Sequence, residues 1–255
     1  MDHSLSFWYL LFNLCSFGFT GTNYGSRPLR ACRNNELEIC IVENINLILP
    51  HLSTGWDSIN LPKLDSLILP AKLTANYQDG NMTLDLLLKD TEIFGLANSQ
   101  VQLVKVKSIT EGKLEIMLKT PSITALGSYT SEGYMSFFPL YSDGQFNVTM
   151  SEVNSAWLVY LYVATINGTE YLRVDHLGLD VMPLEVTVQA AQLLDGDNTL
   201  GVSLNTYLNE NAFELFKMVK PRIMNYFQDI FQKVINSSLL STPKLFILPE
   251  VKIEL

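Results

Sequence analysis

The chain has 255 residues, of which 47% are hydrophobic and 17% are charged, and its formal net charge is −9. This composition excludes a disordered polyampholyte, and a chain of this length can bury a substantial core. The acidic balance argues against a nucleic acid partner and against docking on anionic lipid, since both need clustered lysine and arginine.

The first feature is an apolar segment, Leu5–Phe19, which is followed by small residues. It is typical of a secretory signal peptide, which we place at residues 1–18 with cleavage between about residues 18 and 22. The alternative is a membrane anchor, but fifteen residues interrupted by Asn13 are short for a span of about 20. We therefore expect a secreted, extracellular protein without stable membrane insertion.

Cysteine usage agrees with an oxidising compartment. Cys15 lies in the predicted signal, so the secreted chain keeps Cys32 and Cys40. Such a pair predicts one disulfide, with two free thiols as the alternative.

Four Asn-X-Ser/Thr motifs without a central proline predict glycosylation of a secreted chain, at Asn81, Asn147, Asn167 and Asn236. The first two alternate with apolar strand residues and should face outward. We expect glycans at Asn81, Asn147 and Asn167 more often than at Asn236.

A helix is predicted to begin near Asn35, where Asn35 and Glu38 match a capping box. Apolar residues then recur at helical spacing, at Leu37, Ile41, Ile45, Ile48 and Leu52. Pro50 should end or kink this helix, and Gly55 is a natural stop.

From Leu61 to about Tyr207 the hydrophobic period changes to two, which predicts strands. The clearest alternation is in residues 82–89, 113–119, 146–151 and 184–190. Turn signals follow at Asp79-Gly80, Glu111-Gly112, Asp143-Gly144, Asn167-Gly168 and Asp195-Gly196. Several resemble hairpin turns, so the sheet should be mainly antiparallel.

One strand is apolar on both faces. Trp157, Val159, Leu161 and Val163 share one face, and Leu158, Tyr160, Tyr162 and Ala164 share the other. We expect both faces to be covered.

The last long element is a helix from about Asn209 to Leu239, with a second capping box at Asn211 and Glu214 and an internal Pro221 that should kink it. Its apolar arc reaches roughly 200°, against about 100° for an ordinary surface helix. A flat sheet cannot cover such an arc, whereas a sheet that curls around the helix can. The order predicts an α+β fold in which a strongly curved antiparallel sheet wraps around the C-terminal helix. We expect a single domain over residues 30–250.

No catalytic or cofactor motif stands out. After signal removal only His51 and His176 remain, without cysteine or carboxylate at metal spacing. Nucleophile-elbow and phosphate-loop motifs do not occur in the sequence. We therefore predict a non-catalytic protein with no cofactor and no metal, although paired carboxylates can still meet in space.

Several segments together resemble the insect takeout and haemolymph juvenile-hormone-binding family. They are Cys32 to Cys40 with the helix that follows, L-P-K-L-D-S-L-I-L-P at 61–70, T-E-I-F-G-L-A-N at 91–98, the strand ending at Pro121, P-L-Y-S-D-G-Q-F-N-V-T-M at 139–150 and L-N-E-N-A-F-E-L-F-K-M-V-K-P at 208–221. The resemblance covers roughly residues 30–250. It implies a tubular lipid-binding fold whose tunnel, between sheet and helix, holds a terpenoid, a juvenile hormone or a long-chain lipid.

We accordingly expect a monomeric carrier with a small hydrophobic ligand as its partner. The candidate lining is Leu84, Leu86, Phe94, Ile116, Trp157, Val159, Phe216, Val219, Ile223 and Phe227. Two alternatives stay open: a secreted interaction protein with a filled core, and a hydrolase with an unrecognised site.

Overall fold

The computed structural model describes residues 23–24, 27–28, 30–55, 61–63, 65–69, 72–79, 82–135, 138–193 and 198–253. The chain divides into two compact units, Met1–Arg30 and Ala31–Leu255. In the first unit the described residues form one antiparallel pair, β1 (Asn23–Tyr24) with β2 (Arg27–Pro28). The predicted signal peptide at residues 1–18 lies outside the described residues.

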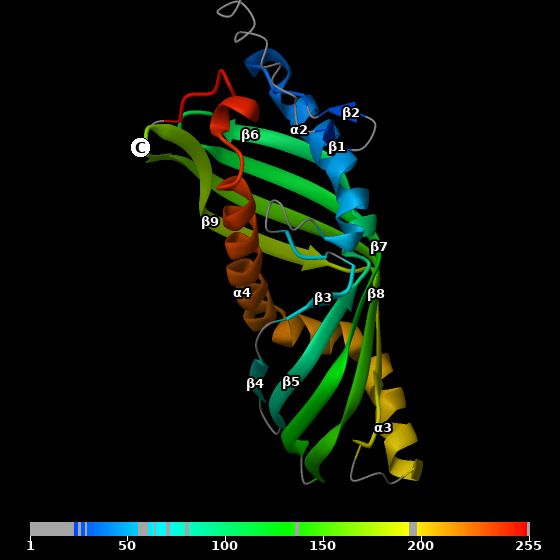
Figure 1. The fold of residues 1–255 in the computed structure, drawn as a ribbon. Helices are drawn as coiled ribbons and strands as arrows, with labels where there is room; N and C mark the ends of the chain where they lie inside the picture. The colour runs from blue at the N-terminus through cyan, green and yellow to red at the C-terminus, as the bar shows by residue number, and fades with distance from the viewer. Residues whose placement is uncertain are drawn as a thin grey trace, which may run out of the picture. The chain divides into compact units, whose positions relative to one another are not determined.

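The second unit combines helices at both ends with an antiparallel sheet between them (Figure 1). Its helices are η1 (Asn34–Glu36), α2 (Leu37–Ile48), η2 (Leu49–Thr54), η4 (Leu96–Asn98), α3 (Asn198–Glu210), α4 (Ala212–Leu239) and η6 (Lys244–Phe246). Its strands are β3 (Leu67–Ile68), β4 (Leu73–Asp79), β5 (Met82–Phe94), β6 (Gln100–Ser108), β7 (Lys113–Met135), β8 (Phe138–Ile166), β9 (Thr169–Met182) and β10 (Glu185–Ala190).

Two long strands, β7 and β8, pair along the whole length of β7 and form the spine of the sheet. One half of this spine carries β6 on the β7 side and β9 on the β8 side. The other half carries β5 on the β7 side, with β3 and β4 beyond it, and β10 on the β8 side. All of these pairings are antiparallel, which confirms the predicted fold class.

The two halves of the sheet meet where β7 contains Pro121 and β8 contains Glu152. Glu152 has a φ of 47°, which is unusual for a residue other than glycine, and Pro121 has no backbone N–H to donate to a neighbouring strand. The inward-facing residues of β8 have even numbers before this point, as at Phe146, and odd numbers after it, as at Val153. The irregularity at Glu152 therefore shifts the inward–outward alternation of β8 by one residue.

Helices α2, α3 and α4 lie along strand edges and bind them through side-chain amides. On α2, Asn46 donates to the Val101 carbonyl at 2.9 Å and accepts from the Val101 N–H at 2.7 Å. On α3, Asn205 binds both backbone groups of Ala190 in the same way. These amides replace the missing neighbouring strand, which satisfies backbone groups that an open edge would leave exposed.

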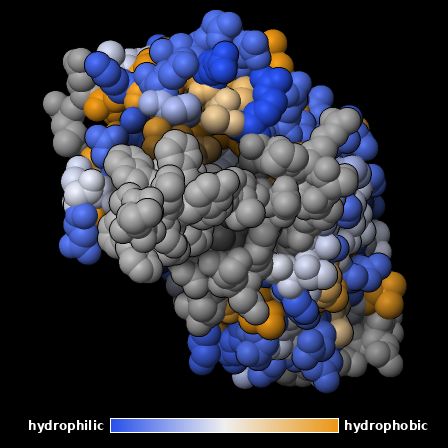
Figure 2. All heavy atoms as spheres, turned by 45° about the horizontal axis from the view of Figure 1, so that its top comes forward, coloured by the Kyte–Doolittle hydropathy of each residue, from blue (hydrophilic) through white to orange (hydrophobic). Residues whose placement is uncertain are grey.

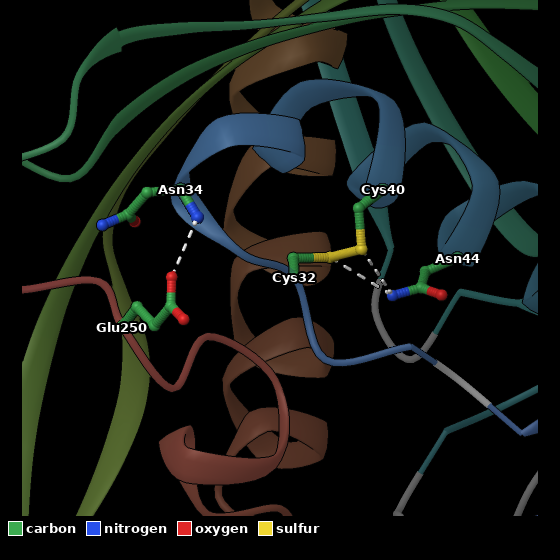
Figure 3. Close-up of a disulfide and its surroundings, with 5 residues drawn as sticks. All are labelled: Cys32, Asn34, Cys40, Asn44 and Glu250. Carbon is green, nitrogen blue, oxygen red and sulfur yellow. Dashed lines mark hydrogen bonds between the residues drawn. A yellow bond between two sulfur atoms is a disulfide. The ribbon is translucent and has the colours of Figure 1, made fainter.

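The predicted disulfide between Cys32 and Cys40 is confirmed, with a Cα–Cα distance of 5.5 Å. It joins the segment before α2 to the first turn of that helix. The Asn44 amide lies 3.5 Å from the Cys32 sulfur, and the Asn34 N–H donates to the Glu250 carboxylate at 3.3 Å (Figure 3). Both sulfurs are buried in a cluster with Leu172, Leu248 and Val251, so the bridge also anchors the C-terminal segment.

The helix predictions need three corrections. Residues 198–207, which we assigned to the strand region, belong to α3, so the single C-terminal helix is really two helices separated at Asn211. Neither capping box forms a side-chain cap. Glu38 instead accepts a hydrogen bond from the Val106 N–H of β6, and Glu214 pairs with Lys217.

Other expectations for the helices are met. Pro221 lies inside α4, where its missing N–H removes a helical hydrogen bond, and Figure 1 shows α4 changing direction along its length. Gly55 follows η2 with a φ of 78°, as a helix stop requires. Among the described helices, none combines the length and apolarity needed to cross a bilayer.

The turn predictions are right at Asn167-Gly168, where both φ angles are positive, and at Gly112 between β6 and β7. The turn predicted at Asp143-Gly144 is wrong, since both residues lie within β8 and pair with β7. Gly144 has another use there, because a Cβ atom would come within 2.1 Å of the Ala191 carbonyl oxygen. Close approach of the segment after β10, and not a turn, requires glycine at this position. Asp195-Gly196 lies outside the described residues.

Candidate ligand-binding interior

The apolar face of α4 contacts residues from strands on opposite edges of the sheet. Phe231 belongs to one cluster with Leu67 and Ile93, from the β3–β5 side, and to another with Val174 and Leu177 from β9. A flat sheet could not bring these strands to one side chain. The sheet therefore curls around α4, as the breadth of the helix's apolar arc predicts.

Aromatic rings line the contact between helix and spine. The ring centroids of Trp157 on β8 and Phe231 on α4 lie 5.2 Å apart, and those of Phe227 and Phe231 lie 6.0 Å apart. The Trp157 indole N–H donates to the Ser155 hydroxyl at 3.3 Å, so the ring is polar only at its edge. The faces that meet α4 are apolar.

Many side chains that face this interior are only half-buried. Leu179, Val181 and Met224 are buried in the central cluster, but the larger residues packed against them keep accessible surface. These half-buried residues are Ile123, Met150, Trp157, Phe216, Ile223, Phe227 and Phe231. A close-packed core leaves little such surface. These side chains therefore pack against the helix–sheet interior without being fully buried.

A second apolar cluster lies under α3, in the other half of the sheet. Tyr129, Phe146 and Leu193 are its buried members, and Leu204 and Leu208 of α3 pack over them. Leu86 and Leu88 of β5 are half-buried there as well. Burial raises the pKa of Tyr129, whose hydroxyl donates to the Ala191 carbonyl at 3.0 Å.

Six of the ten predicted lining residues come together around α4. Ile116, Trp157 and Val159 project from the spine strands, and Phe216, Ile223 and Phe227 project from α4. Leu86 lies instead in the α3 cluster. The side chains of Leu84 and Val219 fall outside the described part of the chain. Contact with a ligand stays a prediction for all ten.

Phe94 lies on the opposite face of β5 from the interior. Its neighbour Ile93 is buried inward against Phe227, and successive strand residues point to opposite faces. The reason is a bulge between Lys89 and Glu92, where Asp90 has a φ of 49°. The extra residue shifts the alternation, so even-numbered residues face inward before the bulge and odd-numbered residues after it.

Sequence reasoning missed several interior residues. Leu204 was overlooked because α3 was assigned to the strand region. Leu208, Met224 and Phe231 belong to the apolar arc expected of the last helix but are not among the lining candidates, although Met224 and Phe231 lie three and four residues from Phe227.

The inner face of the two-faced segment of β8 is covered, as expected. There Val159 packs with Val174 and Leu177. On the outer face Tyr160 is half-buried, with the Lys113 ammonium 5.1 Å from its ring centroid and the His176 ring at 5.9 Å. Cation–π contact and long polar neighbours shield this side of the strand.

Within the described residues, no three histidine, cysteine or carboxylate side chains gather in a way that could hold a metal ion. Figure 2, viewed with the top of Figure 1 turned forward, shows hydrophobic residues set between hydrophilic ones at the upper end. The described interior residues offer apolar and aromatic surface, which is suited to contact with hydrocarbon.

Known proteins that are similar to this chain point to one family. The family described as "Haemolymph juvenile hormone binding protein (JHBP)" matches residues 11–249. The circadian clock-controlled protein daywake of Drosophila yakuba is 22% identical over 223 residues, covering 85% of each chain. The crystal structure of Takeout 1 from Epiphyas postvittana superposes with a TM-score of 0.75 at 19% identity, covering 86% of this chain and 98% of that one. The chain belongs to the haemolymph juvenile hormone binding protein family.

Proposed function

We propose that this protein is a secreted, non-catalytic carrier that binds a small lipophilic molecule between α4 and the inner face of the sheet. The ligand classes that fit are terpenoids, juvenile hormones and long-chain lipids. Secretion rests on the apolar N-terminal segment and on the disulfide, because such bridges persist in oxidising compartments. We place the carrier domain at residues 30–250.

The observation that carries the proposal is the accessible surface left on inward-facing apolar side chains. Trp157, Phe216 and Phe227 face the helix–sheet interior yet remain half-buried. Leaving such surface against water costs about 25 cal/mol per Å². A hydrophobic guest that covers it recovers this free energy, and an apolar space stays dry enough to accept one.

The second candidate is a secreted interaction protein whose interior needs no guest. It predicts that the purified protein carries no lipid and that filling the interior does no harm. The carrier predicts the opposite on both points. A hydrolase stays without positive support, since the lipophile would meet no nucleophile–base pair among the interior residues named above.

The test combines extraction with a filling variant. Secreted protein is analysed by native mass spectrometry and lipid extraction, and then titrated with the fluorescent lipophile N-phenyl-1-naphthylamine. Ile223→Trp adds volume at a half-buried α4 position and should abolish probe binding while the circular dichroism spectrum is kept. Val159→Trp is a poorer choice because Val159 is only 6% exposed, so overpacking would disturb the fold itself.

Ile39→Trp is the matched control, since Ile39 lies on α2 and is 65% exposed. It adds the same ring outside the interior and should bind the probe like the parent protein. If Ile223→Trp folds and binds the probe with unchanged affinity, the ligand does not lie between α4 and the sheet.

A further inference from the structure

A polar pocket lies where α4 meets β9, apart from the apolar interior. It has a volume of about 470 Å³ and is lined by Arg173 of β9, by Asp229, Gln232, Lys233, Asn236 and Ser237 of α4, and by Leu240 just after that helix. Neither Arg173 nor these α4 residues belong to the apolar clusters described above.

The sequence of α4 builds the pocket wall through two adjacent helical stripes. Gln228, Gln232 and Asn236, spaced four apart, donate to the backbone carbonyls of β9 and hold the helix on the strand edge. The next stripe is Asp229, Lys233 and Ser237. Each of its residues follows a residue of the first stripe by one position, so this stripe lies further around the helix from the strand edge and lines the pocket. The hydrogen bonds from Gln228, Gln232 and Asn236 thus fix the distance between β9 and the side chains of the second stripe.

Arg173 is positioned from the strand side. Its neighbours Leu172 and Val174 are both 2% exposed and face inward, so Arg173 points to the opposite face. The two hydrogen bonds between the Asn236 amide and the Val174 backbone hold the adjoining strand in place. The Arg173 Nε atom is buried and has no hydrogen-bond partner within the described part of the chain. A buried cationic donor without a partner is costly, and an anionic acceptor would remove that cost.

The charges around the pocket are unpaired with one another. The ion pairs of the described residues do not involve Arg173, Lys233 or Asp229, although all three line the same space. Two cations against one carboxylate leave a local excess of one positive charge in a chain whose net charge is −9. Arginine is the side chain best suited to recognise a carboxylate or phosphate group, because its planar fork binds two oxygens at once.

We propose that this pocket binds the oxyanion group, phosphate or carboxylate, of a small molecule, independently of the lipophilic interior. Arg173 supplies the fork, Lys233 supplies the second cation, and Ser237 supplies a hydroxyl donor. Asp229 opposes the bound charge and so limits affinity. The site goes beyond the carrier function and stands even if the interior carries no guest.

The experiment titrates ¹⁵N-labelled protein with sodium phosphate against sodium chloride at matched ionic strength. Phosphate should saturate and shift the Arg173 Nε–H resonance, whereas chloride should not. Arg173→Gln should weaken phosphate binding about tenfold or more, as expected for a charge-assisted hydrogen bond. Lys233→Gln, an exposed change that spares the fold, should also weaken binding. Asp229→Asn should strengthen it.

Lys220→Gln is the matched control on the same helix, because Lys220 pairs with Asp180 away from the pocket. It should bind phosphate like the parent. Each folded variant should still bind N-phenyl-1-naphthylamine like the parent, which separates failure of this site from failure of the carrier function. The proposal is overturned by a phosphate response equal to that of chloride, or by weaker binding in Asp229→Asn.

Two further ligands identify the source of the oxyanion. Glycerol 3-phosphate and lysophosphatidic acid present the same phosphate ester, the first without and the second with an acyl chain. Binding of glycerol 3-phosphate that Arg173→Gln weakens assigns the pocket to soluble metabolites. Binding of lysophosphatidic acid alone, weakened by the same variant, assigns it to a lipid headgroup. If Arg173→Gln weakens neither, the pocket does not recognise oxyanions.

Discussion

The side-chain amide of Asn236 on α4 holds both backbone groups of Val174 on β9. The Val174 N–H donates to Asn236 Oδ1 at 2.7 Å, and Asn236 Nδ2 donates to the Val174 carbonyl at 2.9 Å. Asn46 and Val101 repeat this arrangement on α2 and β6. Helices are thereby fixed to open strand edges by hydrogen bonds, while their apolar faces remain directed at the interior.

The first prediction follows from this pair. Asn236→Ala should lower the free energy of unfolding by about 1–3 kcal/mol, because it leaves a half-buried N–H without its acceptor. Asn225→Ala is the control, since Asn225 lies exposed on the same helix. Chemical denaturation followed by circular dichroism measures both. Equal stability of the two variants would show that the amide clamp contributes nothing.

The second prediction concerns the glycans. Asn167 is exposed in the β8–β9 turn, and Asn147 alternates with the inward-facing Phe146 and Val148, so both can carry a sugar. Asn236 cannot do so without displacing β9, because its amide nitrogen is engaged with Val174. Asn81 lies outside the described residues, and its occupancy stays a sequence-based prediction.

Removing the third residue of each motif tests this without disturbing the asparagines. Thr169→Ala should lower the mass of the secreted protein by one glycan. Ser238→Ala should leave the mass unchanged, and it also removes a hydroxyl that is buried without a partner among the described residues. A loss of glycan mass in Ser238→Ala would contradict the prediction.

The third prediction concerns the disulfide. Replacing Cys32 and Cys40 together by alanine should destabilise the protein by about 2.5 kcal/mol, from the added chain entropy of a short loop. The melting temperature should fall, and hydrogen exchange should rise in both α2 and the C-terminal segment, because Leu248 and Val251 pack on the bridge. Faster exchange confined to α2 would mean that the bridge does not anchor the C-terminal segment.

The fourth prediction is a loss of stability at alkaline pH. Burial raises the pKa of Tyr129 above the ordinary tyrosine value of about 10, so the folded state holds this proton more tightly than the unfolded chain. The stabilisation is fully present below about pH 10 and is lost as the pH rises through the folded-state pKa. Tyr129→Phe should flatten this part of the stability curve. Tyr134→Phe, at a tyrosine that is 58% exposed, should leave it unchanged.

The sheet and the breadth of the α4 face could be predicted because they follow from local periodicity. Alternation identified the strands, and the wide apolar arc required a curved partner. The details that failed depend on contacts between distant segments. The bulge at Asp90 turns Phe94 away from the interior, and the backbone of Ala191 explains Gly144 better than any turn does. No local pattern reports either contact.

The helix α3 shows another limit of periodicity. Its sequence is rich in asparagine and threonine, which are weak helix formers, so propensity alone does not favour a helix there. Its helical form is stabilised by tertiary contacts instead, since Asn205 and Asn209 clamp the edge of β10 and Leu208 packs on the sheet. Residues of low helix propensity are used here for edge pairing, which a single sequence does not reveal.

The last prediction concerns what limits affinity in the interior. Binding to apolar and aromatic surface should depend on buried area and not on charge. A guest that buries about 300 Å² gains up to roughly 7 kcal/mol before the costs of association. A series of straight-chain alcohols separates this effect from the oxyanion pocket, since alcohols carry no charge. Affinity measured by displacement of N-phenyl-1-naphthylamine should rise about fourfold per methylene group until the available space is full.

The same series should respond little to salt, because apolar contacts have no long-range field for ions to screen. Ile39→Trp should reproduce the parental series. Ile223→Trp is expected not to bind the probe, so its alcohol series is measured by isothermal titration calorimetry, and its affinity should reach a plateau at a shorter chain because the added ring occupies part of the space. A series with no dependence on chain length, or with affinities that fall steeply as salt is added, would place binding on a polar surface. The accessible surface of Trp157, Phe216 and Phe227 would then need an explanation other than a lipophilic guest.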